Sequence, residues 1–199
     1  QHTDAPGDAL ALARRNIDTW LASLGENGRL AIAATGCAAH VRDYPWLLRD
    51  DPDYAPRASA LMARLVEPES LVTAEAVSAA VEPAERGPVA FHTPCSMQHG
   101  LRAGGRVEPV LAACGYTVQP VPEQGMCCGS AGTYSLLQPG LARELRDRRV
   151  AALTAGGPAL VTTANVGCQQ FLGTGTDTPV QHWLQAVDAA MKPATKRGP

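Results

Sequence analysis

Apolar segments that run into a cysteine recur three times along this chain of 199 residues. They read LAIAATGC, VAFHTPC and LVTTANVGC, and they end at Cys37, Cys95 and Cys168. Short continuous apolar runs are typical of strands that are buried on both faces of a parallel sheet. Segments with apolar residues at three- and four-residue spacing, typical of helices, lie between them. This alternation predicts an α/β fold of mainly parallel sheets with flanking helices.

The individual elements follow from the same patterns. Helices are expected over 8–24, 56–65, 71–81, 100–116, 139–153 and 181–191, and strands over 30–34, 88–92, 116–121 and 159–164. A surface loop with a turn or two of helix is expected at 40–56, and the glycine-rich run GMCCGSAGTY at 125–134 predicts a further loop. Because sites in parallel sheets form at the carboxyl ends of the strands, the three strand-ending cysteines mark the expected site.

The segment EPAERG at 82–87 is the expected boundary between structural units, because Pro83 and Gly87 punctuate a charged stretch without periodicity. Residues 1–85 are then the second part of a first unit and residues 86–192 a complete second unit. The tail at 193–199 is expected to be disordered.

An internal repeat supports two related units. Leu12 opens a helix, loop and strand that reach Cys37 after 25 residues, and Leu141 opens the same series, which reaches Cys168 after 27. Chance similarity between two βα units is the alternative explanation. If the repeat is real, the pair Cys127-Cys128 should have a counterpart upstream of residue 1, and the chain would be the carboxyl-terminal portion of a longer polypeptide.

Composition narrows the function. The formal charge is −2, with 17 basic and 19 acidic residues, so no basic surface for nucleic acid is expected. The apolar runs are shorter than the ~18 residues of a membrane span. Six cysteines are about 3% of the chain, well below the ~8% typical of disulfide scaffolds. Such cysteines more often bind metal or perform redox chemistry.

Four of the cysteines form a candidate metal site: Cys95, Cys127, Cys128 and Cys168. Their spacing lacks the Cys-x-x-Cys clip of zinc fingers and instead brings single thiolates from separate strand ends toward a vicinal pair. Four thiolates are the usual ligands of an iron–sulfur cluster. The alternatives are buried structural thiols, a reading that is favoured for Cys114, a vicinal disulfide that acts as a redox switch, and a structural zinc site.

Histidines and arginines give weaker signals. His92 and His99 flank Cys95 and could ligate a metal or hydrogen-bond to its sulfur, although solvated histidines are commoner. His182 is expected to pack at a helix start. The run RELRDRR from Arg143 to Arg149 predicts a solvated helix face with a Glu144–Arg148 pair. The sequence contains no dinucleotide or P-loop motif, so it offers no means of removing a hydride from a substrate unaided.

Three segments carry a resemblance to a known family. FHTPCSMQHG, GMCCGSAGTYSLLQP and TANVGCQQFL closely resemble the CCG cysteine-rich domain of lactate- and glycolate-utilisation subunits and heterodisulfide reductase-like proteins. The resemblance covers nearly the whole chain, and CCGSAGTYSLLQP favours the glycolate branch. In one departure, the Cys-x-x-Cys ending of the general CCG motif appears here as Asn165-x-x-Cys168, so one cysteine of the broader pattern is missing. This disfavours clusters with five or more thiolates and favours a site of four cysteines.

The resemblance implies a non-catalytic iron–sulfur subunit that passes electrons from a flavin-containing dehydrogenase subunit, which oxidises a 2-hydroxy acid such as glycolate, to an acceptor. It implies a cluster of the 4Fe–4S type on Cys95, Cys127, Cys128 and Cys168. Cys37 would be a ligand only with the upstream pair. The complex would be cytoplasmic, or attached peripherally to the inner face of the cytoplasmic membrane. The alternatives are a heterodisulfide reductase-like or lactate-utilisation subunit and a zinc-stabilised interaction module.

Overall fold

The structure is a computed structural model that describes residues 4–191, so the expected tail at 193–199 lies outside the described residues. The chain divides into two compact units, unit 1 up to Leu71 and unit 2 from Val72. This division lies before the 82–87 segment. The assignment of residues 1–85 and 86–192 to two related units stays a prediction.

Unit 1 is mainly helical. Its elements are α1 (Pro6–Leu24), β1 (Leu30–Ala31), α2 (Thr35–Arg42), α3 (Tyr44–Leu47), α4 (Ala55–Met62), β2 (Leu65–Val66) and α5 (Pro68–Leu71). Pro6 stands at the first helical position of α1, where its missing N–H costs nothing. Ile17 of α1 is fully buried and packs in one apolar cluster with Tyr44 and Leu61. The pattern of apolar residues along 8–24 predicted this helix.

The strand expected at 30–34 is only partly confirmed. β1 covers two residues and pairs in parallel with β2, which the sequence pattern did not reveal. Leu30 is half-buried and Ala31 exposed, so burial on both faces was wrong. Within residues 4–191, only β2 pairs with β1, and the single alanine of β1 is exposed and buries little apolar surface.

Ile17 offers a test of the core of unit 1. Replacing Ile17 with alanine should lower the free energy of unfolding of this unit by about 2–5 kcal/mol, because the lost methyl groups leave a cavity. Leu12 on the same helix is 54% exposed, and its replacement should cost less than about 0.5 kcal/mol. Urea denaturation followed by hydrogen exchange in peptides of unit 1 measures both. Equal losses would contradict the assigned core.

Unit 2 is built around a sheet of four parallel strands in the order β4-β3-β5-β6. Its elements are α6 (Ala74–Ala80), β3 (Pro88–His92), the π-helical turn η1 (Ser96–Gly100), α7 (Glu108–Ala113), β4 (Thr117–Gln119), α8 (Tyr134–Leu137), α9 (Pro139–Thr154), β5 (Leu160–Thr163), α10 (Val166–Gly173), β6 (Val180–His182) and α11 (Trp183–Ala190). The predicted α/β class with parallel sheets is confirmed.

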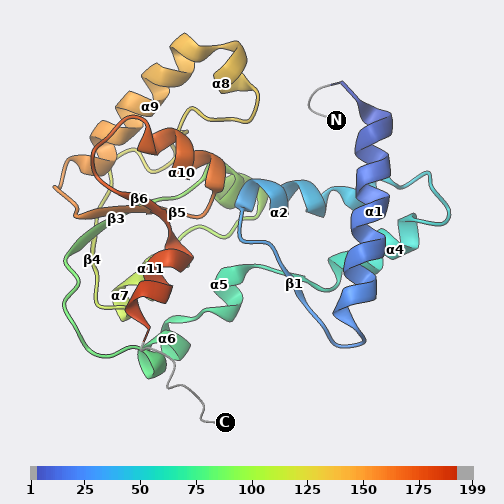
Figure 1. The fold of residues 1–199 in the computed structure, drawn as a ribbon, viewed down its shortest axis with the longest axis horizontal. Helices are drawn as coiled ribbons and strands as arrows, with labels where there is room; N and C mark the ends of the chain where they lie inside the picture. Colours follow the sequence, from blue (N-terminus) through green and yellow to red (C-terminus); the bar gives the residue numbers. More distant parts are fainter. Residues whose placement is uncertain (1–3, 192–199) are drawn as a thin grey trace, which may run out of the picture. The chain divides into compact units, whose positions relative to one another are not determined.

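Helices cover both faces of this sheet. Figure 1 shows α9 and α10 on one side, and α7 and α11 on the other. On the first side, Leu153 of α9 and Leu172 of α10 pack against Ala90 and Val161 of the two central strands. Side chains alternate along a strand, so His92 lies on the same face as Ala90. The central strands therefore direct His92 toward the α9 side.

The helix expected over 100–116 was wrong in part. The structure has the turn η1 before it and then α7, with irregular backbone between them. Gly105 has a φ of 79°, which is incompatible with a continuous helix. Among residues 4–191, no helix is long and apolar enough to cross a bilayer.

Candidate metal centre

The four predicted cysteines of unit 2 lie together at the carboxyl ends of the two central strands. Cys95 follows β3, and Cys168 is the third residue of α10, just after β5. The pair Cys127-Cys128 comes from the loop between β4 and α8. Because β3 and β5 are paired in parallel, their ends meet at one edge of the sheet.

Their sulfurs form a continuous row. The Sγ atoms of Cys128 and Cys168 are 2.9 Å apart. Cys127 interacts with both Cys128 and Cys95, which extends the row to Cys95. All four are free thiols, since the Sγ–Sγ distance of a disulfide is about 2.05 Å. A vicinal disulfide at Cys127-Cys128 is not formed in this structure.

Thiols and thiolates alternate along the row, from Cys95 through Cys127 and Cys128 to Cys168. Hydrogen bonds from Cys128 and Cys95 hold the pKa of Cys127 far below its ordinary value. A hydrogen bond from Cys128 likewise lowers the pKa of Cys168 to about 5. The same contacts raise the pKa of Cys95 and Cys128, because each keeps its proton beside a neighbouring sulfur; the single proton of Cys128 lies between Cys127 and Cys168 and serves both. Since thiolate is the form that binds metal, half of the donor set is ready at neutral pH.

Backbone and side-chain N–H groups support these thiolates. The amide of Gly129 donates to Sγ of Cys127 at 3.3 Å. Asn165 donates from Nδ2 to Sγ of Cys168 at 3.5 Å. Cys168 also lies in the first turn of α10, where the helix dipole stabilises negative charge. At position 165, where the general CCG motif has a cysteine, this chain therefore has an asparagine that donates a hydrogen bond to Cys168.

Exposure changes steadily along the row. Cys95 is exposed and Cys127 half-buried, whereas Cys128 and Cys168 are 2% and 3% exposed. The site therefore has one edge at the surface and one edge in the apolar core between the sheet and α9.

Buried polar side chains lie beside the inner edge of the cysteine row. Of these, only His92 was proposed from the sequence as a site residue. One imidazole nitrogen of His92 and the sulfurs of Cys128 and Cys168 all lie within 4.8 Å of one another. Arg149 of α9 donates from Nε to Nδ1 of His92 at 3.0 Å. Thr163 is the strand neighbour of His92 in the register of β3 and β5. All three side chains belong to residues with no exposed surface.

Two atoms of these side chains have no hydrogen-bond partner among the described residues: Arg149 Nη2 and Thr163 Oγ1. His92 Nε2 makes no hydrogen bond of good geometry, but the His92 side chain interacts with the sulfur of Cys168 and helps to lower the pKa of that thiol. Buried N–H and O–H groups without partners are costly, so a native structure normally supplies an acceptor. Sulfur atoms of a bound metal centre would be such acceptors. The donor set and the orphaned polar atoms therefore both fit an anionic metal–sulfur group.

The prediction of a solvated face from Arg143 to Arg149 was wrong for Arg149, which is fully buried. Its neighbour Arg148 is exposed but pairs with Glu123 rather than with Glu144. The i,i+4 spacing indicated an intrahelical pair, whereas the loop before Cys127 supplies a carboxylate from outside the helix. No local pattern marks which arginine of a charged run points inward.

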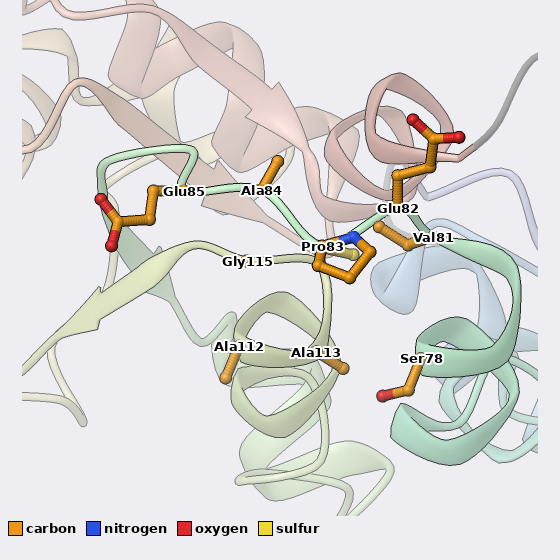
Figure 2. A pocket seen from close by; sticks show the side chains of 10 residues that line it. Ser78, Val81, Glu82, Pro83, Ala84, Glu85, Ala112, Ala113 and Gly115 are labelled. Atoms are coloured by element: carbon orange, nitrogen blue, oxygen red, sulfur yellow. The ribbon is translucent and has the colours of Figure 1, made fainter.

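Other candidates lie away from the row. Cys114 is buried at the end of α7, as the structural reading expected. It lines a hollow of about 630 Å³ between α7 and the 81–85 segment, drawn in Figure 2. His99 is exposed in η1. His182 caps α11 by accepting from the amide of Leu184 at 3.3 Å.

Cys37 belongs to unit 1, where the sequence contains no second cysteine. It is exposed and is the third residue of α2, after β1, just as Cys168 is the third residue of α10, after β5. This equivalence favours the internal repeat. A ligand role for Cys37 stays a prediction.

Four neighbouring thiols in a row form a soft donor set, which suits zinc, copper(I) or an iron–sulfur cluster. Residues 89–173 match the family described as the CCG cysteine-rich domain, and this segment contains all four thiols. The segment that holds the four thiols is therefore similar to a CCG cysteine-rich domain.

Relatives extend the similarity to both units. The glycolate oxidase iron-sulfur subunit of Escherichia coli is 40% identical over 193 residues, which cover 96% of this chain and 47% of the relative. The probable glycolate oxidase iron-sulfur subunit of Bacillus subtilis is 26% identical over 84% of this chain and 38% of the relative. Lactate utilization protein A of Shouchella clausii is 23% identical over 92% of this chain and 77% of the relative. The chain thus spans less than half the length of the two glycolate oxidase relatives.

Proposed function

We propose that this chain is the electron-transferring portion of an iron–sulfur subunit in a 2-hydroxy acid oxidase complex. A 4Fe–4S cluster would be held by Cys95, Cys127, Cys128 and Cys168. The observation that carries the proposal is the row of four thiols with orphaned buried donors at its inner end. Two relatives are named as a glycolate oxidase iron-sulfur subunit and a probable one, which supports the choice of iron and sulfide over zinc.

Each residue has a separate part in such a site. The four sulfurs would hold iron, and the cluster would take up and release one electron when bound. The Gly129 amide and Asn165 Nδ2 keep their hydrogen bonds to Cys127 and Cys168, which withdraw charge from these sulfurs. Exposed Cys95 marks the edge at which electrons would enter or leave, because electron transfer is favoured by close approach of the partner.

The chemistry on the hydroxy acid would belong to another subunit. Hydride removal from such a substrate needs a flavin or nicotinamide, and the sequence contains no motif for either. We therefore propose a flavin-containing subunit as the electron donor, with glycolate as the favoured substrate. The complex would be cytoplasmic, and any association with the inner face of the cytoplasmic membrane would come through it.

Metal analysis tests the proposal. The full-length protein, purified without oxygen, should contain about four iron and four sulfide for each 4Fe–4S site and should show broad brown absorption. Clusters elsewhere in a full-length protein would add to this total, so the comparison with a variant that lacks Cys128 isolates the site. Zinc as the sole metal would instead make the unit a structural interaction module. No metal after reconstitution with iron and sulfide would overturn the ligand assignment.

A further inference from the structure

Arg149 is the most unusual charged residue of unit 2. It is fully buried, although the remainder of its charged run is largely exposed. Nη1 donates to the carbonyl oxygens of Pro122 and Glu123 at 3.0 and 2.7 Å. Glu123 adopts a φ of 52°, a conformation that is unfavourable for a residue with a side chain. The loop is thus bent in a costly way that provides acceptors for this guanidinium.

These neutral partners leave the charge of Arg149 uncompensated. Burying a cation is costly unless negative charge lies nearby. Among the described residues, no carboxylate lies within ion-pair distance of Arg149, since the carboxylate of Glu123 is bound to Arg148. Burial lowers the pKa of Arg149, and electrostatic attraction to Cys128, Glu123 and Cys168 opposes this effect. Through its contact with His92, the guanidinium lies beside the inner end of the row, where negative charge on the sulfurs of a bound centre would compensate its own.

The hydrogen bond from Arg149 also determines which nitrogen of His92 carries the proton. A guanidinium has no acceptor atom, so Nε of Arg149 must donate and Nδ1 of His92 must accept. The neutral imidazole then carries its proton on Nε2. A protonated Nε2 has no lone pair for a metal, but it can donate to sulfur. The His92 side chain lies in the same buried group as Cys168 and helps to lower the pKa of that thiol by hydrogen bonding, although Nε2 makes no hydrogen bond of good geometry.

We propose that Arg149 and His92 act together as a buried positioning pair: Arg149 fixes His92 as an N–H donor to the sulfur at Cys168, and its charge raises the reduction potential of the centre. The inference rests on the proposed function, since it needs a redox-active cluster. Reduction adds negative charge, which a fixed cation and an N–H donor stabilise more strongly in the reduced state. His92 is accordingly a donor to the site and not one of its ligands.

Redox titration of the full-length protein tests the role of the charge. At a fixed potential, Arg149→Gln should lower the ratio of reduced to oxidised cluster at this site at least tenfold, a shift of about 59 mV for one electron. Arg149→Lys, which keeps the charge, should shift it less. Arg148→Gln is the matched control, because it removes the same charge from an exposed neighbour on the same helix. Equal shifts for Arg148→Gln and Arg149→Gln, or no shift for either, would overturn the proposal.

Pulsed electron paramagnetic resonance of the reduced wild-type protein tests the role of His92. This test does not depend on whether the Arg149 variants fold. The expected result is a weakly coupled exchangeable proton and weak histidine nitrogen coupling. Both should disappear in His92→Leu, and His92→Gln, which can return a donor N–H, should restore the proton. Strong coupling from a bound nitrogen would make His92 a ligand and overturn the proposal, and so would the absence of any coupling to His92.

The two hypotheses fail in different ways. A full-length protein that loads no iron at this site refutes the proposed function and removes the inference with it. A protein that loads iron normally, with a potential and spectrum indifferent to Arg149 and His92, refutes the inference alone. Iron content measured in the same samples separates these results.

Discussion

Replacing Cys128 with serine is expected to remove most of the iron bound at this site. Cys128 is the central member of the row, with contacts to both Cys127 and Cys168, and it is 2% exposed. A hydroxyl is a poor ligand for iron–sulfur clusters, so the loss should exceed the roughly 10–100-fold drop in affinity typical of changes to outer-shell partners. In the proposed complex, electron transfer to the acceptor should stop, while oxidation of the acid at the flavin of the partner subunit remains measurable. Iron and sulfide analysis measures the first effect.

Cys114→Ala is the matched control for this variant. Cys114 is equally buried and lies in the same unit, yet it lines a different part of the structure. The control should retain the iron content of the wild type. Full retention of iron in the Cys128→Ser protein would refute the ligand assignment, and equal losses in both would indicate general unfolding of the unit.

Replacing Gly129 with alanine should destabilise unit 2 by about 2–4 kcal/mol, which combines an unfavourable backbone conformation with steric overlap. Gly129 has a φ of 86°, and a Cβ atom there would overlap the carbonyl oxygen of Ala142 in α9. The loop would have to move away from α9, and the Gly129 amide donates to Cys127. Iron content should therefore fall together with stability. Urea denaturation of unit 2 gives the free energy.

Gly132→Ala separates the two causes. Gly132 lies in the same loop and also has positive φ, at 61°, but a Cβ there would meet no atom within 4 Å. It should cost only the conformational term of about 1–2 kcal/mol and leave the iron bound. If both variants lose the same free energy of unfolding, the close approach of Gly129 to α9 contributes nothing to stability, and the prediction is wrong.

Much of the fold could be predicted because its signals are local. Apolar runs marked β3 and β5, and helical periodicity marked α1 and α9. The parallel pairing followed from the alternation of the two. Three glycines and a cysteine pair marked the loop at 125–134. The juxtaposition of the four cysteines followed from a general property of parallel sheets, in which the carboxyl ends share an edge.

The remaining features depend on contacts that no local pattern encodes. β6 has three residues and is the edge strand of the sheet, too short to show a period. Arg149 looks like any other arginine of its run, and its burial depends on carbonyls of Pro122 and Glu123 that come from a distant loop. Asn165 reads as a missing ligand in the sequence, whereas the structure reveals it as a donor to Cys168.

The arrangement of the row also orders events during biosynthesis. Cys95 and Cys168 are 73 residues apart in the chain and come together only when β5 pairs with β3. A nascent chain that has reached only α9 holds three of the thiols and lacks the fourth. The last ligand arrives with α10, shortly before the sheet gains its edge strand β6. The complete centre can therefore be loaded only after α10 has been synthesised, and the bound metal would then lock segments that are far apart in the chain.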